Sequence, residues 1–276
     1  MIYFPNAKIN IGLNVLTKRE DGYHNIESVF YPVMICDAIE ATKNEGFGSV
    51  HLAAYGNDIP GTIDANLCIK AYNLLNTKFK LPSLNLGLLK HIPIGGGLGG
   101  GSADATFFLK MLKEMFNLKI NTEDLKLYAS KLGSDCTFFI DNIPALVSGT
   151  GDVVSPLPLD LSGYFICIVH PKVHIDTKNA YSLITPKKPE YNLMQTILET
   201  HIDSWKETVI NDFEKPIFDL HPELAEVKNT LYNSGALYAS MTGSGSALYG
   251  IFDKKPYLAE VLPTCKIWTL QPNSLK

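Results

Sequence analysis

The sequence predicts a protein that combines helices and strands, arranged as two domains or as one large domain. Its 276 residues exceed the usual size of a single hydrophobic core. Segments with alternating apolar residues, typical of strands, are interspersed with segments whose apolar residues recur at helical spacing. The stretch from Pro93 to Thr106 joins one segment of each kind through a run of glycines, and the rest of the chain is organised around it.

The first expected element is a strand or strand pair in residues 2–16. Alternate positions are apolar there, so Lys8 and Asn10 lie together on the opposite, polar face. A lysine on the polar face of a strand is usually exposed to water. The two neighbours could equally begin a polar site.

A turn centred on Asp21 and Gly22 follows. The β-branched and aromatic run 26–35 predicts a second strand, with Tyr23 and His24 at its entrance. These two rings either cover the end of a hairpin or contact a planar base or a sugar.

The helices of the N-terminal half are predicted from spacing and capping residues. Asn66 and Asn121 are suited to accept hydrogen bonds at helix N-termini, and Gly133 is suited to end a helix. We expect helices at 66–79, 102–117 and 121–133, and a strand at 84–89.

The glycine-rich stretch lies between that strand and the helix at 102–117. Six glycines and one leucine fill residues 95–101. Glycine adopts positive φ without strain, and a helix N-terminus offers free N–H groups that favour phosphate. Ser102 could add a hydroxyl group to a phosphate or to a magnesium ion. A flexible linker is the alternative. The stretch lacks the terminal Gly-Lys-Ser/Thr of a Walker A motif and the context of a dinucleotide fingerprint.

Asp135 follows the helix at 121–133 and precedes an apolar run. A carboxylate beside Phe138 and Phe139 is costly unless it is paired. Asp135 either caps the next short helix or acts as a catalytic carboxylate held ionised by a cation, for which Lys8 is the candidate.

The C-terminal half is expected to begin after the proline-rich junction at 156–158, which divides the chain into domains 1–157 and 158–276. The Gly/Ser segment Met241–Ser246 could bind a second phosphate, support the first loop, or form a plain hairpin turn. We expect a strand at 164–170, helices at 177–183, 194–199, 205–209 and 221–234, and a strand–turn–strand unit at 236–252.

Composition excludes several classes of function. The net charge of −4 argues against binding to nucleic acid or to an anionic membrane. Five scattered cysteines indicate reduced thiols and no structural zinc, and we expect no metal bound by protein ligands alone. The sequence has neither a signal peptide nor an apolar run long enough to span a bilayer, so we expect a cytoplasmic protein.

Three collinear segments together resemble the GHMP small-molecule kinases, the family of galactokinase, homoserine kinase and mevalonate kinase. Pro93–Thr106 is similar to the family's phosphate loop, and Ala7–Ile11 and Met241–Ser246 are similar to its first and third motifs. The resemblance implies an α+β fold of two domains: an N-terminal domain like domain 2 of ribosomal protein S5 and a ferredoxin-like C-terminal domain.

Arg19–His24 and Gly133–Cys136 are similar to the branch of the family that phosphorylates the 2-hydroxyl of 4-diphosphocytidyl-2-C-methyl-D-erythritol, in the non-mevalonate isoprenoid route. This resemblance implies ATP and Mg²⁺ as cofactors, Lys8 and Asp135 as catalytic residues, and a monomer or homodimer. It implies nucleotide contacts from Pro93, Ile94, Gly95, Gly96, Gly97, Leu98, Gly99, Gly100, Gly101, Ser102 and Ala103. It implies substrate contacts from Asn10, Tyr23, His24, Thr177 and Tyr181.

Two alternatives stay open. The chain could be another GHMP enzyme, of homoserine or mevalonate type, against which the run Asp21–His24 argues. It could also be a sensor that binds nucleotide without catalysis, against which the presence of both Lys8 and Asp135 argues.

Overall fold

The computed structural model describes residues 1–271, and its contacts divide the chain into two compact units. The first unit contains residues 1–7, 35–94 and 99–142, and the second contains residues 8–34, 95–98 and those from 143 onward. This division differs from the sequence-based one at residue 157, which follows chain order. The physical reason is that strands from residues 8–34 are hydrogen-bonded to strands that follow residue 143 and form one sheet with them.

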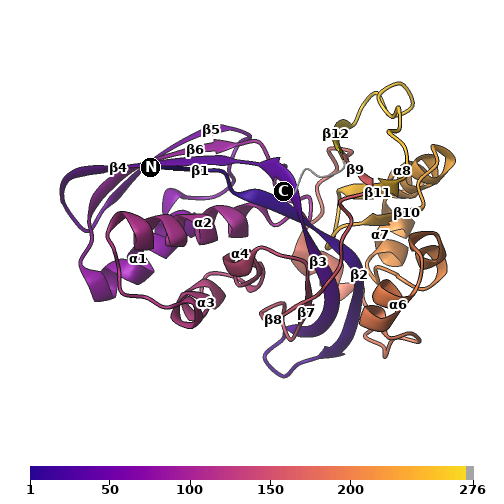
Figure 1. Ribbon diagram of the computed structural model, residues 1–276, viewed down its shortest axis with the longest axis horizontal. Helices are drawn as coiled ribbons and strands as arrows, with labels where there is room; N and C mark the ends of the chain where they lie inside the picture. The colour runs from indigo at the N-terminus through magenta and orange to yellow at the C-terminus, as the bar shows by residue number, and fades with distance from the viewer. Residues whose placement is uncertain (272–276) are drawn as a thin grey trace. The chain divides into compact units, whose positions relative to one another are not determined.

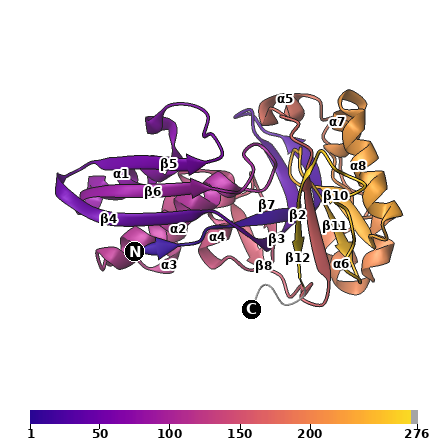
Figure 2. The ribbon, with the colours of Figure 1, turned by 90° about the horizontal axis from the view of Figure 1, so that it is seen from above.

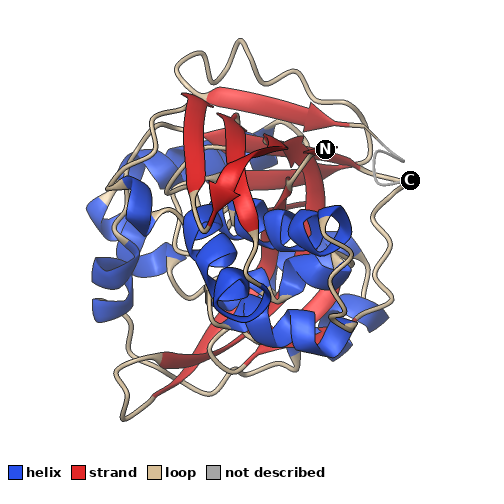
Figure 3. Ribbon diagram, turned by 90° about the vertical axis from the view of Figure 1, so that its left-hand side faces the viewer, coloured by secondary structure: helices blue, strands red, loops and turns tan. Residues whose placement is uncertain are grey.

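The first unit is a four-stranded sheet with helices on one face (Figures 1 and 3). Its strand order is β1-β4-β6-β5, in which β4 and β6 are antiparallel and β5 and β6 are parallel. Leu84, Leu86 and Leu88 alternate along β6 and pack in one core with Phe108 and Leu112 of α2. The strands are β1 (Ile2–Tyr3), β4 (Ala38–Phe47), β5 (Val50–Gly56) and β6 (Pro82–Lys90). The helices are η1 (Ile63–Ala65), α1 (Leu67–Phe79), α2 (Gly100–Met115), α3 (Thr122–Ser130), η2 (Ser134–Cys136) and α4 (Phe138–Asp141).

The predicted N-terminal caps are confirmed, whereas α3 ends at Ser130 with Lys131 as its C-cap and not at Gly133. The Asn66 side chain accepts a hydrogen bond from the Cys68 N–H at the start of α1, and Asn121 accepts one from the Asp124 N–H at the start of α3. Each cap satisfies one of the N–H groups that a helix leaves free at its N-terminus. Helix α2 starts two residues earlier than predicted, at Gly100, because the last glycines of the loop already adopt helical conformation.

The second unit holds two four-stranded sheets, with orders β2-β3-β7-β8 and β10-β11-β9-β12. The second sheet is antiparallel throughout, and its order is that of a ferredoxin-like sheet. It departs from that fold in residues 253–265, which connect β11 to β12 without a helix. The strands are β2 (Asn6–Lys18), β3 (His24–Cys36), β7 (Ala145–Ser148), β8 (Val153–Pro156), β9 (Phe165–His170), β10 (Tyr238–Met241), β11 (Leu248–Phe252) and β12 (Lys266–Leu270).

Helices α7 and α8 lie beside the antiparallel sheet (Figure 2). Leu224 of α8 packs in one core with Val169, Met241 and Leu248 of the sheet. The segment predicted as a helix at 205–209 is a 3₁₀ helix that begins slightly earlier. The helices are α5 (Thr177–Ser182), α6 (Leu193–Glu199), η3 (Ile202–Glu207), α7 (Glu214–Leu220) and α8 (Pro222–Asn233). Within residues 1–271, no helix is both long and apolar enough to cross a membrane.

Candidate active site

The glycine loop has the backbone geometry of an anion-binding turn. Gly95, Gly97 and Gly99 have φ of 73°, 73° and 72°, and α2 begins at Gly100. Positive φ at every second residue turns successive N–H groups toward one side of the chain, as in phosphate-binding nests. Only glycine adopts such a series without strain. The predicted strand–loop–helix connection is therefore confirmed, and the linker alternative is wrong.

The segment Met241–Ser246 supports the loop. A Cβ at Gly97 would overlap the carbonyl oxygen of Thr242, so the two backbones touch. The Ala247 N–H also donates to the Gly96 carbonyl at 3.3 Å. Of the three possibilities for this Gly/Ser segment, the contacts favour support of the first loop.

Lys8 is buried against the loop rather than exposed. Its side chain is 3% exposed, and its Nζ donates to the Gly97 carbonyl at 3.0 Å and to Asn10 Oδ1 at 2.6 Å. The ammonium group also lies 4.5 Å from the centroid of the Phe30 ring. The expectation that a strand lysine is exposed to water is therefore wrong for Lys8, because β2 is covered on its polar face as well.

Asn10 connects the first and third motif segments. Its Oδ1 accepts from Lys8, its Nδ2 donates to Ser28 Oγ at 2.9 Å, and its N–H donates to Thr242 Oγ1 at 3.1 Å. The residue is 1% exposed. The structure thus brings Lys8, Asn10 and the middle of the glycine loop together.

Two further polar residues hold this arrangement and were missed in the sequence. Asn211 donates through Nδ2 to the carbonyls of Met241 and Gly243, at 2.7 and 2.9 Å. The Tyr249 hydroxyl donates to the Asn10 carbonyl at 2.8 Å. Both side chains donate to backbone carbonyls that are distant in the sequence, so no local sequence pattern predicts these hydrogen bonds.

Asp135 lies in η2, in the first unit, close to the start of α2. Thr106 Oγ1 donates to the Cys136 carbonyl at 2.9 Å, which ties η2 to α2. Asp135 is half-buried and does not cap the next helix, since the residue before α4 is Thr137 and no side-chain cap is formed there. The capping alternative is therefore wrong. Burial raises the pKa of the neighbouring Cys136 thiol to about 11, so this thiol is protonated at neutral pH.

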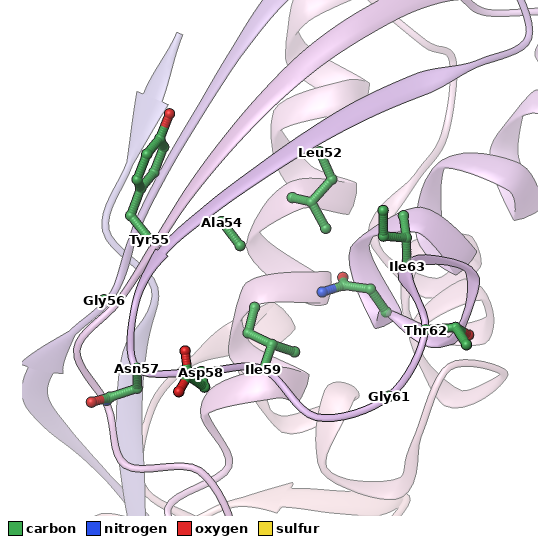
Figure 4. Close-up of a pocket in the computed structure, with 11 residues that line it drawn as sticks. Leu52, Ala54, Tyr55, Gly56, Asn57, Asp58, Ile59, Gly61, Thr62 and Ile63 are labelled. Carbon is green, nitrogen blue, oxygen red and sulfur yellow. The ribbon is translucent and has the colours of Figure 1, made fainter.

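The first unit also contains a pocket of about 300 Å³. Leu52, Ala54 and Ile59 contribute apolar walls, and Asn57 lies at one end (Figure 4). The Asn57 side chain donates to the carbonyls of His91 and Ile92, both at 3.2 Å. The pocket therefore opens beside the residues that lead into the glycine loop.

Asn66, the N-cap of α1, is also among the residues that line this pocket. Near it, a Cβ at Gly101 would lie 4.0 Å from Leu67 Cδ1, so the starts of α1 and α2 are adjacent. The segment 57–66 is polar and irregular, and its sequence gave no sign of a pocket.

The predicted substrate residues of the second unit fall into two groups. The rings of His24 and Tyr181 are stacked, with centroids 5.0 Å apart and an interplanar angle of 21°, and Phe213 meets Tyr181 edge-on. Burial, and to a smaller extent Lys18, lowers the pKa of His24, so its ring is neutral at pH 7. Thr177 lies at the start of α5 and its hydroxyl is 3.1 Å from that of Ser244, whereas Tyr23 is 67% exposed.

Among residues 1–271, no cluster of three or more His, Cys, Asp or Glu side chains could hold a metal ion. All five cysteines are free thiols.

Two family comparisons agree with this geometry. Residues 66–150 match the GHMP kinases N terminal domain, and residues 193–263 match the GHMP kinases C terminal domain. The chain belongs to the GHMP kinase family. Membership confirms the resemblance to this family and the two-domain GHMP kinase fold with its mixed α/β content.

Relatives within the GHMP family are similar over nearly the whole chain. A 4-diphosphocytidyl-2-C-methyl-D-erythritol kinase of Bacteroides thetaiotaomicron is 49% identical, over 94% of this chain and 95% of its own length. One of Parabacteroides distasonis is 45% identical, over 97% and 98%. A crystal structure of 4-(cytidine 5'-diphospho)-2C-methyl-D-erythritol kinase superposes with a TM-score of 0.79 at 28% identity, covering 98% of both chains.

Proposed function

We propose that this chain transfers the γ-phosphoryl group of ATP to the 2-hydroxyl of 4-diphosphocytidyl-2-C-methyl-D-erythritol, giving the 2-phosphate and ADP in non-mevalonate isoprenoid synthesis. The near-full-length identity to kinases of that name supports the substrate. The observation that carries the chemistry is the Lys8 ammonium group, which is buried and bonded to the carbonyl of Gly97 inside the glycine loop.

The ATP phosphates bind at residues 93–103. The N–H groups of the loop donate to phosphate oxygens, and the N-terminus of α2 adds about half a positive charge. The pocket beside Asn57 has the size, the apolar side chains and the amide groups of Asn57 and Asn66 to hold the base of the nucleotide. The sites proposed for the phosphates and for the base thus lie in neighbouring parts of the chain.

The transfer itself requires a base and charge stabilisation. Asp135 accepts the proton of the 2-hydroxyl, the oxygen bonds to the γ-phosphorus, and the bond from that phosphorus to the β–γ bridging oxygen breaks to release ADP. We assign to Lys8 the stabilisation of the negative charge that develops on the attacking oxygen. The burial of Asn10 favours a positioning role, in which it orients Lys8 by the 2.6 Å hydrogen bond.

The cytidine end of the substrate binds at the stacked rings. A cytosine ring stacks on Tyr181, next to His24, and such stacking is worth about 1–3 kcal/mol per base. The exposed Tyr23 is the other aromatic ring that we expect at the cytidine end. Thr177 offers a hydroxyl group to the same substrate from the start of α5.

Mg²⁺, when bound with ATP, neutralises phosphate charge. The Ser102 hydroxyl at the start of α2 and the Asp135 carboxylate are oxygen ligands of the kind this ion prefers. We place the reaction in the cytoplasm, where free thiols stay reduced.

The test is ADP release with 4-diphosphocytidyl-2-C-methyl-D-erythritol, beside mevalonate and homoserine as alternative acceptors. We expect turnover with the cytidyl alcohol alone, and a new phosphomonoester signal in the phosphorus NMR spectrum of the product. Turnover of mevalonate or homoserine instead would support another GHMP enzyme. Nucleotide binding without ADP release, whichever alcohol is supplied, would support the sensor alternative.

A further inference from the structure

The short segment 210–214 covers the open edge of strand β10. This strand has a neighbour on one side only, since the order of its sheet is β10-β11-β9-β12. The other side of an edge strand carries N–H and C=O groups that need partners when they are buried. At the buried Met241, the last residue of β10, Glu214 Oε1 accepts from the N–H at 2.8 Å and Asn211 Nδ2 donates to the carbonyl at 2.7 Å. Two side chains therefore take the place of a neighbouring strand.

Asn211 and Glu214 are themselves buried, with exposed fractions of 1% and 8%. Asn211 Oδ1 accepts from the Phe213 N–H at 3.0 Å. Glu214 accepts from the Ser240 hydroxyl at 3.0 Å and, through Oε2, from Lys228 of α8 at 2.6 Å. These further bonds fix the orientation of both side chains, and buried polar groups are tolerated only when they are bonded in this way.

The same segment is also bonded to strand β2. The Asp212 N–H donates to the Leu13 carbonyl at 2.8 Å, and the Val15 N–H donates to Asp212 Oδ2 at 2.8 Å. Strand β2 carries Lys8 and Asn10. One segment therefore joins the strand of the proposed catalytic lysine to the end of β10.

The Asn211 amide reaches past the end of β10 as well. Its Nδ2 donates to the Gly243 carbonyl at 2.9 Å, so one side chain holds the backbone on both sides of Thr242. A Cβ at Gly243 would lie 3.1 Å from Gly97 Cα, which shows how closely this turn packs on the glycine loop. A displacement of the turn would therefore reach the loop.

Thr242 shares its hydrogen-bond partners with the Lys8 ammonium group. Its hydroxyl oxygen lies 3.1 Å from the Gly97 carbonyl and 3.2 Å from Asn10 Oδ1. Lys8 Nζ donates to the same two oxygen atoms. A hydroxyl group has one proton and donates to one acceptor at a time, so the position of Thr242 affects how both oxygens bond the ammonium group.

We propose that Asn211 and Glu214 are positioning residues for phosphoryl transfer, because they hold the end of β10 where Thr242 fixes the acceptors of the Lys8 ammonium group. The inference rests on the proposed function in taking Lys8 as the group that stabilises the attacking oxygen. A displacement of about 1 Å at a reacting group can cost roughly 100-fold in rate. Loss of either positioning residue therefore lowers kcat more than it weakens the binding of the alcohol.

The first test compares Asn211→Asp with the natural chain. Aspartate has nearly the same shape and keeps an acceptor for the Phe213 N–H, but an oxygen replaces the amide group that donates to the two carbonyls. We expect kcat to fall about 10- to 100-fold and KM for the cytidyl alcohol to stay within twofold. The phosphorus NMR signals of bound ADP should also shift, because the turn supports the glycine loop, and this measurement needs no turnover.

Tyr232→Phe is the matched control. The Tyr232 hydroxyl also donates to a carbonyl of β10, that of Ala239 at 3.2 Å, which lies two residues before Met241. We expect this variant to unfold at a lower urea concentration but to keep the kcat and the ADP signals of the natural chain. Equal losses of kcat in Asn211→Asp and Tyr232→Phe would overturn the inference, because a general loss of stability would then explain both.

Two variants of Glu214 keep the inference testable if Asn211→Asp does not fold. Glu214→Gln keeps an oxygen acceptor for the Met241 N–H and removes the charge that is paired with Lys228, whereas Glu214→Ala removes both. We expect Glu214→Gln to keep kcat within about threefold and Glu214→Ala to lose tenfold or more. Equal kcat in the two variants would contradict a positioning role for this carboxylate.

A double variant tests the route through Thr242. If Asn211 acts through Thr242, Asn211→Asp should lower kcat little further in a chain that already carries Thr242→Val, because changes to residues that act as a unit are not additive. Independent, additive losses of kcat would contradict the inference.

The natural chain separates this inference from the proposed function. If it phosphorylates mevalonate or homoserine instead of the cytidyl alcohol, the proposed function is contradicted and the comparison of kcat is made with that alcohol. If it binds ADP without turnover, the phosphorus NMR comparison decides the inference. Normal kcat and unchanged ADP signals in Asn211→Asp would contradict the inference alone.

Discussion

Replacement of Gly97 by alanine is expected to distort the glycine loop and weaken the binding of ATP. Gly97 has a φ of 73°, and an alanine held there costs about 1–2 kcal/mol relative to glycine. The added Cβ would also overlap the Thr242 carbonyl oxygen, which belongs to a buried backbone turn that cannot easily move. Overpacking of this kind typically costs a further 1–3 kcal/mol, roughly.

The two costs together amount to about 2–5 kcal/mol, and the protein can respond in one of two ways. If the loop keeps its shape, the protein is destabilised by that amount and its urea midpoint falls. If the loop moves, its N–H groups no longer converge, and a loss of about 2 kcal/mol in binding corresponds to a roughly thirtyfold higher Kd for ATP.

The matched control is Gly163→Ala in the same unit. Gly163 has no atom within 4 Å of an added Cβ and is not among the glycines with positive φ. We expect this variant to bind ATP and to unfold like the natural chain. Equal ATP affinity and equal urea midpoints for Gly97→Ala and Gly163→Ala would refute the argument from backbone geometry.

Three other predictions concern the reaction. Asp135→Asn should lower kcat by about 10²–10⁴-fold, the usual contribution of a general base, and leave the Kd for ADP within twofold. The control Asp141→Asn, which removes another carboxylate of the same unit, should keep full turnover. A normal kcat in Asp135→Asn would remove Asp135 from the mechanism. Tyr181→Ala should raise KM for the cytidyl alcohol about tenfold or more, as expected for a lost base–aromatic stack, and leave KM for ATP unchanged. The control Tyr257→Ala, at an exposed position, should alter neither KM. Equal effects of Tyr181→Ala on the KM of both substrates would mean a structural role. Because burial lowers the pKa of His24 below its ordinary value of 6.5, its ring gains a proton at a lower pH than an ordinary histidine does. KM for the cytidyl alcohol should therefore rise on acidification with a midpoint below that of an ordinary histidine, and a rise centred near pH 7 would contradict this assignment.

The local structure of this protein could be predicted because its causes lie within a few residues of one another. The caps Asn66 and Asn121 act on N–H groups two or three residues ahead of them, and the alternation of leucines in β6 reflects the period of a strand. The glycine loop is equally local, since positive φ at alternate residues requires glycine at those positions.

The surroundings of the catalytic residues depend on segments that are far apart in the chain. Lys8 has the sequence pattern of an exposed strand lysine and is buried because the loop 89 residues later lies against it. Asn10 bonds Thr242 across 232 residues. The hydrogen bonds of Asn211 to the carbonyls of Met241 and Gly243 have no local signal for the same reason.

The sequence by itself determined the helices, the strands, the phosphate-binding loop and the family, because these follow from backbone periodicity, capping and the order of the motifs along the chain. The tertiary structure alone decided that residues 8–34 fold with the second unit and that Lys8 and Asn10 are buried against the loop. It also decided that the buried Lys90 ammonium group pairs with the carboxylates of Asp37 and Asp104. Burial and charge balance are properties of a packed neighbourhood, and that neighbourhood exists only once distant segments have come together.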